Sequence, residues 1–254
     1  MGKKIIGIIL SFVMAMASFA NAEKVKLTTM NWAPYIGKDL ADQGFIAEIT
    51  RAAFKAGGVD EVEIFYLPWG KAVELAKMGN ADGLFPVWEN KNLKVDFNYS
   101  SSMPCGPVAF IKMKGKEFNY TGKFEELKPY KIGVVAGYVN TEEIDKATDL
   151  TKIEAKDDMA NIQNLLAGKV DVAILDPLVA TNIIKNDKNL APFLEKIETV
   201  KPVLRHTKLY IAFSKKSANA DALMQKFNDG IAKIEADGSL ETILKKHKIE
   251  DIVK

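Results

Sequence analysis

The segment Gly168-Lys169-Val170-Asp171 ends a helical pattern and opens an apolar run that continues to Leu175. The same junction occurs earlier, where Gly79-Asn80-Ala81-Asp82 follows another helical pattern and leads into apolar residues as far as Val87. Glycine is common just past the end of a helix, and a short apolar run between turn residues is typical of a buried strand. Because such glycines are widespread, coincidence remains an alternative. We interpret the repeated junction as the sign of two similar lobes.

Each junction completes an alternation of strands and helices. Up to and including the first junction, the patterns predict strands at Val25–Met30, Val62–Tyr66 and Ala81–Val87. They predict helices between these strands, at Phe45–Ala56 and Trp69–Met78. Those of the second predict a strand, two helices and a strand at Lys131–Val135, Thr141–Lys146, Asp157–Ala167 and Asp171–Leu175. This alternation is typical of an α/β fold with mostly parallel sheets, in which ligands bind outside the carboxyl ends of the strands.

The chain is expected to cross between the lobes twice, in apolar segments that could form extended hinge strands. These segments lie near Val108 to Lys114 and near Thr207 to Phe213. Two helical patterns, Ala220–Ala236 and Leu240–His247, would then return to the first lobe. We therefore expect residues 23–108 and 212–254 in lobe 1 and residues 109–211 in lobe 2.

The first 22 residues have the order of a secretory signal peptide. Lys3 and Lys4 precede an apolar run from Ile5 to Met16, and small residues follow before the charged Glu23. The run is shorter than the roughly 20 residues of a membrane-spanning helix, and cleavage is expected between Ala22 and Glu23. With no cysteine near that bond for a lipid anchor, the sequence predicts a protein released into the periplasm.

Charge and composition argue against several classes of function. Without residues 1–22 the chain has 33 basic and 33 acidic residues, so nucleic acid is not an expected partner. Cys105 is the only cysteine, which excludes an internal disulfide. Imidazole could come only from His206 and His247, and His247 stands among lysines that suggest a solvated surface. No metal-ligand spacing or phosphate-binding loop is present, so we expect no metal, no cofactor and no catalytic site.

The chain as a whole resembles the bacterial extracellular solute-binding proteins of family 3, the polar amino acid type related to histidine- and glutamine-binding periplasmic proteins. The resemblance rests on the order of several short motifs across the chain after residue 22: Trp32-Ala33-Pro34-Tyr35, Gly44 to Ile49, Leu67 to Lys71, Val95-Asp96-Phe97, Lys131 to Val134, and Gly168 to Asp176. It implies the periplasmic binding protein-like fold, two α/β lobes joined by two hinge strands that close on a ligand. It also implies an ABC permease in the inner membrane as partner, and a monomer.

The resemblance further implies which residues bind the ligand. Trp32 and Tyr35 lie in the loop where the family places an aromatic against the ligand, and Asp176 matches the carboxylate that binds an α-ammonium group. Asp176 before Pro177 is equally a good helix N-cap. Trp88 follows the third strand and is a further pocket candidate, whereas Trp69 is expected in the core.

The sequence departs from the family at the groups that hold a ligand carboxylate. Lys91 stands where relatives have an arginine, and lysine cannot form the same planar, two-pronged contact. Tyr138 replaces a small hydroxyl residue after Gly137, although Asn140 could cap the following helix and orient backbone N–H groups toward an anion. The ligand could therefore be an amino acid, a modified amino acid or an amine.

The sequence thus predicts a periplasmic protein that captures a small polar ligand, an amino acid or a relative of one, and delivers it to an ABC-type importer. Two alternatives remain open. The fold could serve as a periplasmic enzyme like the cyclohexadienyl dehydratases, or the closed protein could be sensed by a receptor.

Overall fold

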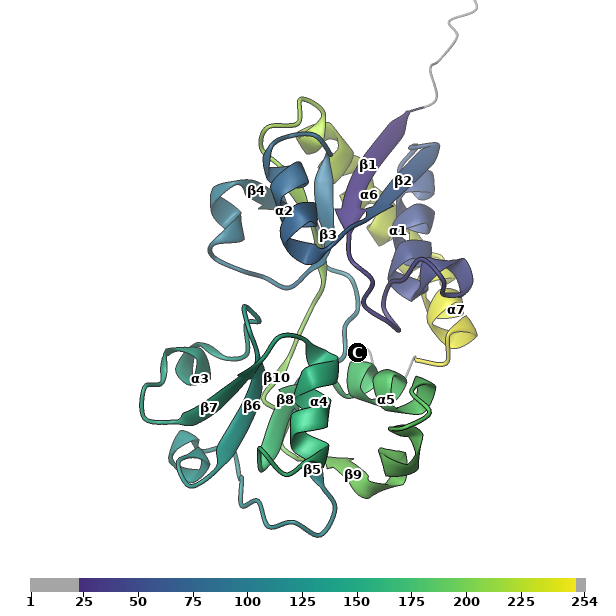
Figure 1. The fold of residues 1–254 in the computed structure, drawn as a ribbon. Coiled ribbons are helices and arrows are strands. Elements are labelled where there is room, and N and C mark those ends of the chain that lie inside the picture. The colour runs from purple at the N-terminus through teal and green to yellow at the C-terminus, as the bar shows by residue number, and fades with distance from the viewer. Residues whose placement is uncertain (1–22, 250–254) are drawn as a thin grey trace, which may run out of the picture.

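The computed structural model describes residues 23–249, which form two α/β lobes joined by two extended segments (Figure 1). The predicted signal peptide, with its cleavage site after Ala22, lies outside the described residues. Across residues 23–249, no helix combines the length and the apolar composition needed to cross a bilayer.

The first lobe is built on a five-stranded sheet in the order β2-β1-β3-β11-β4. Its strands are β1 (Lys24–Thr29), β2 (Glu61–Tyr66), β3 (Gly83–Val87), β4 (Phe97–Tyr99) and β11 (Tyr210–Ser214). The first three pair in parallel, and β11 runs antiparallel to both its neighbours. Two crossover helices, α1 (Phe45–Ala56) and α2 (Trp69–Lys77), contribute to separate hydrophobic clusters on this sheet. Single 3-10 turns, η1 (Ala41–Gln43) and η2 (Leu93–Val95), lie in the connections.

The second lobe has a main sheet in the order β10-β5-β8-β6-β7, with β9 also paired to β5. Its strands are β5 (Pro107–Met113), β6 (Lys131–Val135), β7 (Thr151–Ala155), β8 (Val172–Leu175), β9 (Ile197–Thr199) and β10 (Arg205–His206). Its helices are α3 (Glu142–Lys146), α4 (Asp158–Leu166) and α5 (Pro177–Asn186), with 3-10 segments η3 (Phe124–Leu127) and η4 (Ala191–Lys196). Successive residues of β8 alternate between two hydrophobic clusters, so both faces of the sheet are covered.

The repeated Gly-x-x-Asp junction has the same structure in both lobes. Gly79 and Gly168 have positive φ, which glycine adopts without strain. Asp82 and the backbone of Lys26 exchange two hydrogen bonds of 2.8 Å, and Asp171 and Lys131 do the same at 2.9 and 2.7 Å. Each aspartate thus ties the last parallel strand of its lobe to the first, a shared geometry that a coincidental sequence match would not produce.

The predicted α/β fold is confirmed, and each strand and helix of the predicted alternation lies within one or two residues of its expected bounds. The sequence patterns missed β7. This strand lies at the edge of the second sheet and has the sequence TKIEA, whose charged side chains are usual at a sheet edge but weaken the apolar signal.

The expected hinge strands lie mostly inside the two sheets. Pro107–Met113 and Tyr210–Ser214 are strands inside the second and first sheets respectively, and they are apolar because they are buried. The chain passes between the sheets just before β5 and just before β11. There Met103 and Leu209 exchange backbone hydrogen bonds of 2.7 and 3.0 Å, and the Thr207 hydroxyl donates to the carbonyl of Gly106 at 2.7 Å. The two crossing segments are therefore fastened to each other.

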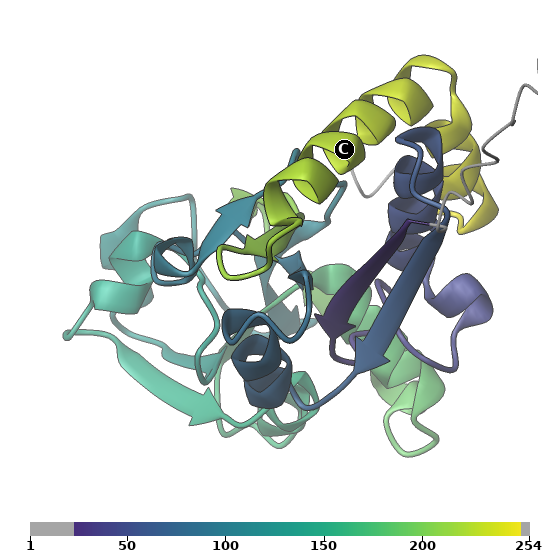
Figure 2. The same cartoon turned by 90° about the horizontal axis from the view of Figure 1, so that it is seen from above.

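The C-terminal helices α6 (Ala220–Ala236) and α7 (Ser239–Lys246) pack against α1, beside which α6 lies in the view from above (Figure 2). A side chain at Gly230 would stand 1.8 Å from the Ala53 carbonyl oxygen, so glycine allows α6 to approach α1 this closely. Residues that follow the second lobe in the chain thus complete the core of the first.

Candidate ligand-binding site

The predicted site residues come from loops at the carboxyl ends of the parallel strands. Trp32 follows β1 and Trp88 follows β3 in the first lobe, while Tyr138 follows β6 and Asp176 follows β8 in the second. The edge where ligands bind in open α/β sheets is thus turned from each lobe toward the other.

A cleft of about 230 Å³ opens between these loops. Both lobes contribute to its wall, whose residues are Met30, Trp32, Trp69, Val73, Pro86, Val87, Trp88, Asn90, Leu93, Gly137, Tyr138, Val139 and Leu209. Among these described residues none is charged, and Asn90 supplies the one amide side chain. The cleft therefore favours an apolar group over a charged one.

A much smaller inner pocket, of about 10 Å³, lies next to the cleft. Trp32, Trp88 and Tyr138 line both spaces and form the boundary between them. The inner pocket is also lined by Asn140, Val179 and two acidic residues, Asp158 and Asp176. A space of this size holds a group about as large as one water molecule.

The boundary is built from aromatic rings of both lobes. The Trp32 and Trp88 rings lie 5.5 Å apart at 85°, and Trp88 and Tyr138 lie 5.6 Å apart at 84°. Perpendicular contacts of this kind are favourable between aromatic rings. The indole nitrogens of both tryptophans are buried and have no hydrogen-bond partner among the described residues. Two donors thus lie beside the inner pocket, and the Trp32 side chain is close enough to Asp158 to favour its ionised form.

Asp176 is only 3% exposed, and both its carboxylate oxygens are engaged. Oδ1 accepts from the backbone N–H groups of Leu178 (2.7 Å) and Val179 (3.4 Å), so the residue is the predicted N-cap of α5. Oδ2 accepts from the Tyr35 hydroxyl of the other lobe at 2.5 Å. Burial raises the pKa of Asp176 to about 6, although these hydrogen bonds favour its ionised form.

Tyr35 is fully buried, and its ring stacks on Trp32 at 4.3 Å. Its hydroxyl also accepts a 2.8 Å hydrogen bond from the N–H of Gly106, in the first crossing segment. A side chain at Gly106 would come within 2.8 Å of the Tyr35 oxygen and 3.0 Å of Asp176. Tyr35 therefore joins the two lobes at the crossing and does not line the cleft.

Asp158, which the sequence analysis did not select, is the other acid of the inner pocket. It stands in the first turn of α4, just after the N-cap Asp157, and is 8% exposed. The Tyr138 hydroxyl donates to its Oδ2 at 3.1 Å. Burial raises the pKa of Asp158 to about 6, while Tyr138 and the neighbouring Trp32 side chain favour its ionised form. No sequence motif marks this aspartate, because only the packing of the two lobes brings it to the pocket.

Of the other residues considered in the sequence analysis, Gly137 and Trp69 line the cleft and Lys91 does not. Gly137 lines the cleft, and Trp69 does so too, which corrects its expected place in the core. Trp69 is 39% exposed because α2 begins at this residue beside the cleft. Lys91 lines neither pocket. Its side chain is 89% exposed and lies 3.8 Å from the carboxylate of Glu142 across the lobes.

Asn140 lines the inner pocket but does not cap α3 as expected. Thr141 is the N-cap, and its hydroxyl accepts from the N–H of Ile144 at 3.2 Å. The Asn140 side chain instead donates to Asp145 at 2.9 Å. Threonine is also a favourable N-cap, and Thr141 stands at the residue directly before the helix.

Arg205 is a cation near the site that the sequence analysis missed. Its guanidinium carbon lies 5.5 Å from the centre of the Trp88 ring, and one of its nitrogens donates to the Val139 carbonyl at 2.7 Å. Arg205 lines neither the cleft nor the inner pocket. It supports Trp88 and the Gly137 loop from outside the two spaces.

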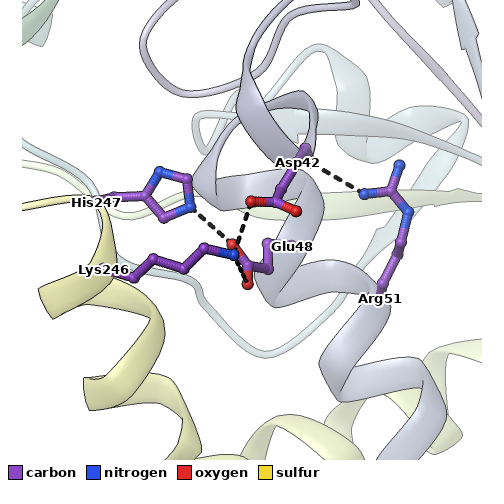
Figure 3. Close-up of polar contacts among 5 residues, drawn as sticks. All are labelled: Asp42, Glu48, Arg51, Lys246 and His247. Atoms are coloured by element: carbon purple, nitrogen blue, oxygen red, sulfur yellow. Dashed lines mark hydrogen bonds and ion pairs between the residues drawn. The ribbon is translucent and has the colours of Figure 1, made fainter.

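One cluster among the described residues could supply metal ligands (Figure 3), and none of its residues lines the cleft or the inner pocket. Asp42, Glu48 and His247 converge there, but the Lys246 ammonium group lies 2.7 Å from Asp42 and 2.8 Å from Glu48. The two carboxylates therefore already share a cation of the protein. His247 bonds to Glu48 at 2.7 Å and is half-buried, so its expected solvated position is wrong. The cluster fastens α7 to α1.

The chain is similar to solved structures of two-lobed binding proteins. The glutamate-bound ligand-binding core of GluR0 from Nostoc punctiforme matches with a TM-score of 0.69 and 15% identity, over 87% of this chain and 98% of that one. An amino acid ABC transporter substrate-binding protein from Streptococcus pneumoniae, bound to L-arginine, matches with a TM-score of 0.67 and 18% identity, over 91% and 97%. A histidine kinase sensor domain with similarity to periplasmic binding proteins matches with a TM-score of 0.70 and 18% identity, over 88% and 95%.

No protein-family model and no curated protein matches the chain. The similar structures are consistent with the solute-binding resemblance of the sequence, and the family itself stays a prediction. At these identities the comparison establishes the fold, and the chain has the two-lobed α/β fold of periplasmic binding proteins.

Proposed function

We propose that the protein is a periplasmic solute-binding protein that encloses a small ligand bearing an amino group, an amino acid or a relative of one, and delivers it to an ABC-type importer. The observation that carries this proposal is the aromatic boundary at the cleft, where Trp32 and Trp88 of one lobe meet Tyr138 of the other. A ligand held among these rings contacts both lobes at once.

Such a ligand favours the closed arrangement because the contacts from the two lobes are complete only when the lobes meet. A ligand can shift an opening equilibrium only through its preference for one of the two states. Aromatic rings and buried acids suit an amine, which is attracted to both a π-face and a carboxylate. Delivery to a permease follows the resemblance of the sequence, and the arginine-bound transporter protein from Streptococcus pneumoniae supports it.

A sensing role is the second candidate, supported by the similar histidine kinase sensor domain. The same closed form could then dock on a receptor. Deleting the gene separates the two roles: loss of ligand uptake indicates import, and loss of a response with uptake intact indicates sensing.

The binding proposal is tested on the purified chain from residue 23 to 254. A thermal-shift panel of amino acids and amines should include a compound that raises the melting temperature, since a ligand selective for the folded state stabilises it. That compound should also reduce the radius of gyration in small-angle scattering as the lobes close. Trp88→Ala should weaken its affinity at least tenfold, whereas Phe65→Ala, at an exposed aromatic that lines neither pocket, should not. A panel without any stabilising compound contradicts the proposal.

A further inference from the structure

The inner pocket contains two buried acids, Asp158 and Asp176, which differ in how many hydrogen bonds their carboxylates already accept. Asp176 has both oxygens engaged, by the start of α5 and by Tyr35. A ligand ammonium group at Asp176 would have to displace the Tyr35 hydroxyl, which in turn is fixed by Gly106. In this arrangement Asp176 holds the lobes together.

Asp158 has fewer partners. Among the described residues Tyr138 donates a hydrogen bond to one of its oxygens, and the neighbouring Trp32 side chain also favours its ionised form. Its pKa is raised because it is buried, so as a carboxylate it lacks the solvation that water would give. A cation in the inner pocket would supply the missing charge partner, and the aromatic rings of Trp32, Trp88 and Tyr138 line the same space.

The size of the inner pocket restricts the cation. About 10 Å³ accepts one water-sized group, which a primary ammonium matches and a trimethylammonium exceeds. The cleft beyond the three aromatic rings restricts the rest of the ligand, because its wall is apolar apart from Asn90 and the tips of the aromatic residues. Neither space is lined by Lys or Arg, so a ligand carboxylate would have no charge partner there.

We infer that the ligand is an apolar primary amine without a carboxylate, whose ammonium group binds Asp158 between Trp32, Trp88 and Tyr138 and whose apolar body fills the cleft. This inference rests on the proposed binding function and narrows its ligand class. The two tryptophans belong to one lobe, and Tyr138 and Asp158 to the other. Opening of the lobes therefore parts the aromatic boundary and admits the ammonium group, and closure traps it.

Calorimetric titration of the full chain from residue 23, at pH 7.5, tests the ligand class with pairs that differ only by a carboxylate. The pairs are 2-phenylethylamine with L-phenylalanine, tryptamine with L-tryptophan, and 3-methylbutylamine with L-leucine. We expect at least one amine to bind ten times more tightly than its amino acid. We expect no binding of 2-phenylethanol, which lacks the charge, or of trimethylated 2-phenylethylammonium, which is too large for the inner pocket.

Variants identify the acid that binds. Asp158→Asn keeps the shape and removes the charge, and it should lower affinity for the best amine at least tenfold. Asp157→Asn is the matched control, because this neighbour is exposed and asparagine also caps a helix, and it should leave affinity unchanged. Circular dichroism confirms that both variants are folded.

The outcomes separate this inference from the function on which it rests. Tighter binding of an amino acid than of every amine overturns the amine assignment and leaves the binding function intact. Loss of amine binding in Asp176→Asn but not in Asp158→Asn overturns the choice of acid. If no amine and no amino acid binds, both proposals fail.

Discussion

Asp158 and Asp176 lie in the same pocket at the N-terminal ends of neighbouring helices, and burial raises the pKa of each to about 6. They differ in their partners. Asp176 accepts three hydrogen bonds through both oxygens, whereas Asp158 accepts one, from Tyr138, and has the Trp32 side chain beside it. Burial alone therefore does not distinguish a structural acid from a binding acid. The number of unsatisfied acceptor positions distinguishes them, because a buried carboxylate with few hydrogen-bond partners gains most from a ligand cation.

The largest effect that this comparison predicts is the loss of the structural acid. Asp176→Ala removes the cap of α5 and leaves the buried Tyr35 hydroxyl without its acceptor, so the free energy of unfolding should fall by about 2–4 kcal/mol. Urea denaturation measures this change. Asp157→Ala, which removes an exposed cap of α4, should cost only about 1 kcal/mol. Equal losses in the two variants would contradict a special structural role for Asp176.

A change of pH should have a smaller effect on the free energy of unfolding. Both aspartates have a folded-state pKa above that of an unfolded aspartate, so the folded state binds more protons between about pH 4 and pH 6. Their contribution to stability is complete below the unfolded pKa and is lost as the pH rises through about 6. The unliganded protein should therefore lose stability from these two groups between pH 5 and pH 7.5.

Asp158→Asn isolates one of the two groups. Because the neutral amide avoids the buried charge, the variant should be more stable than the natural chain at pH 7.5, by on the order of 2 kcal/mol, and the difference should shrink at pH 5. Chemical denaturation of both proteins at the two pH values measures it. A variant less stable at pH 7.5 would show that Asp158 is already well paired in the unliganded protein.

The smallest effect is expected at Lys91, which the sequence suggested as a partner for a ligand anion. Its side chain is exposed, and its contact with Glu142 is a surface ion pair of the kind that contributes little. Lys91→Ala should leave both the unfolding midpoint and the ligand affinity unchanged. A tenfold loss of affinity would return Lys91 to the binding site and weaken the case for a ligand without a carboxylate.

The sequence predicted the elements of the fold well where a local pattern carried the signal. The helix Phe45–Ala56 has its expected bounds because apolar spacing and a terminal glycine agree, and the two Gly-x-x-Asp junctions have the same structure in both lobes. The edge strand β7 lacks an apolar pattern. The apolar sequences of β5 and β11 do not distinguish a buried strand inside a sheet from a hinge strand, because the two can have the same composition.

The sequence by itself determined the α/β alternation, the aromatic loops at the strand ends and the cap at Asp176, because each depends on residues close together in the chain. Only the tertiary structure decided which side chains meet. Tyr35 reaches Asp176 across 141 positions of sequence, while Asp158 faces Trp32 and Trp88 from the opposite lobe. Such pairings follow from how the two lobes pack, and no local propensity encodes them.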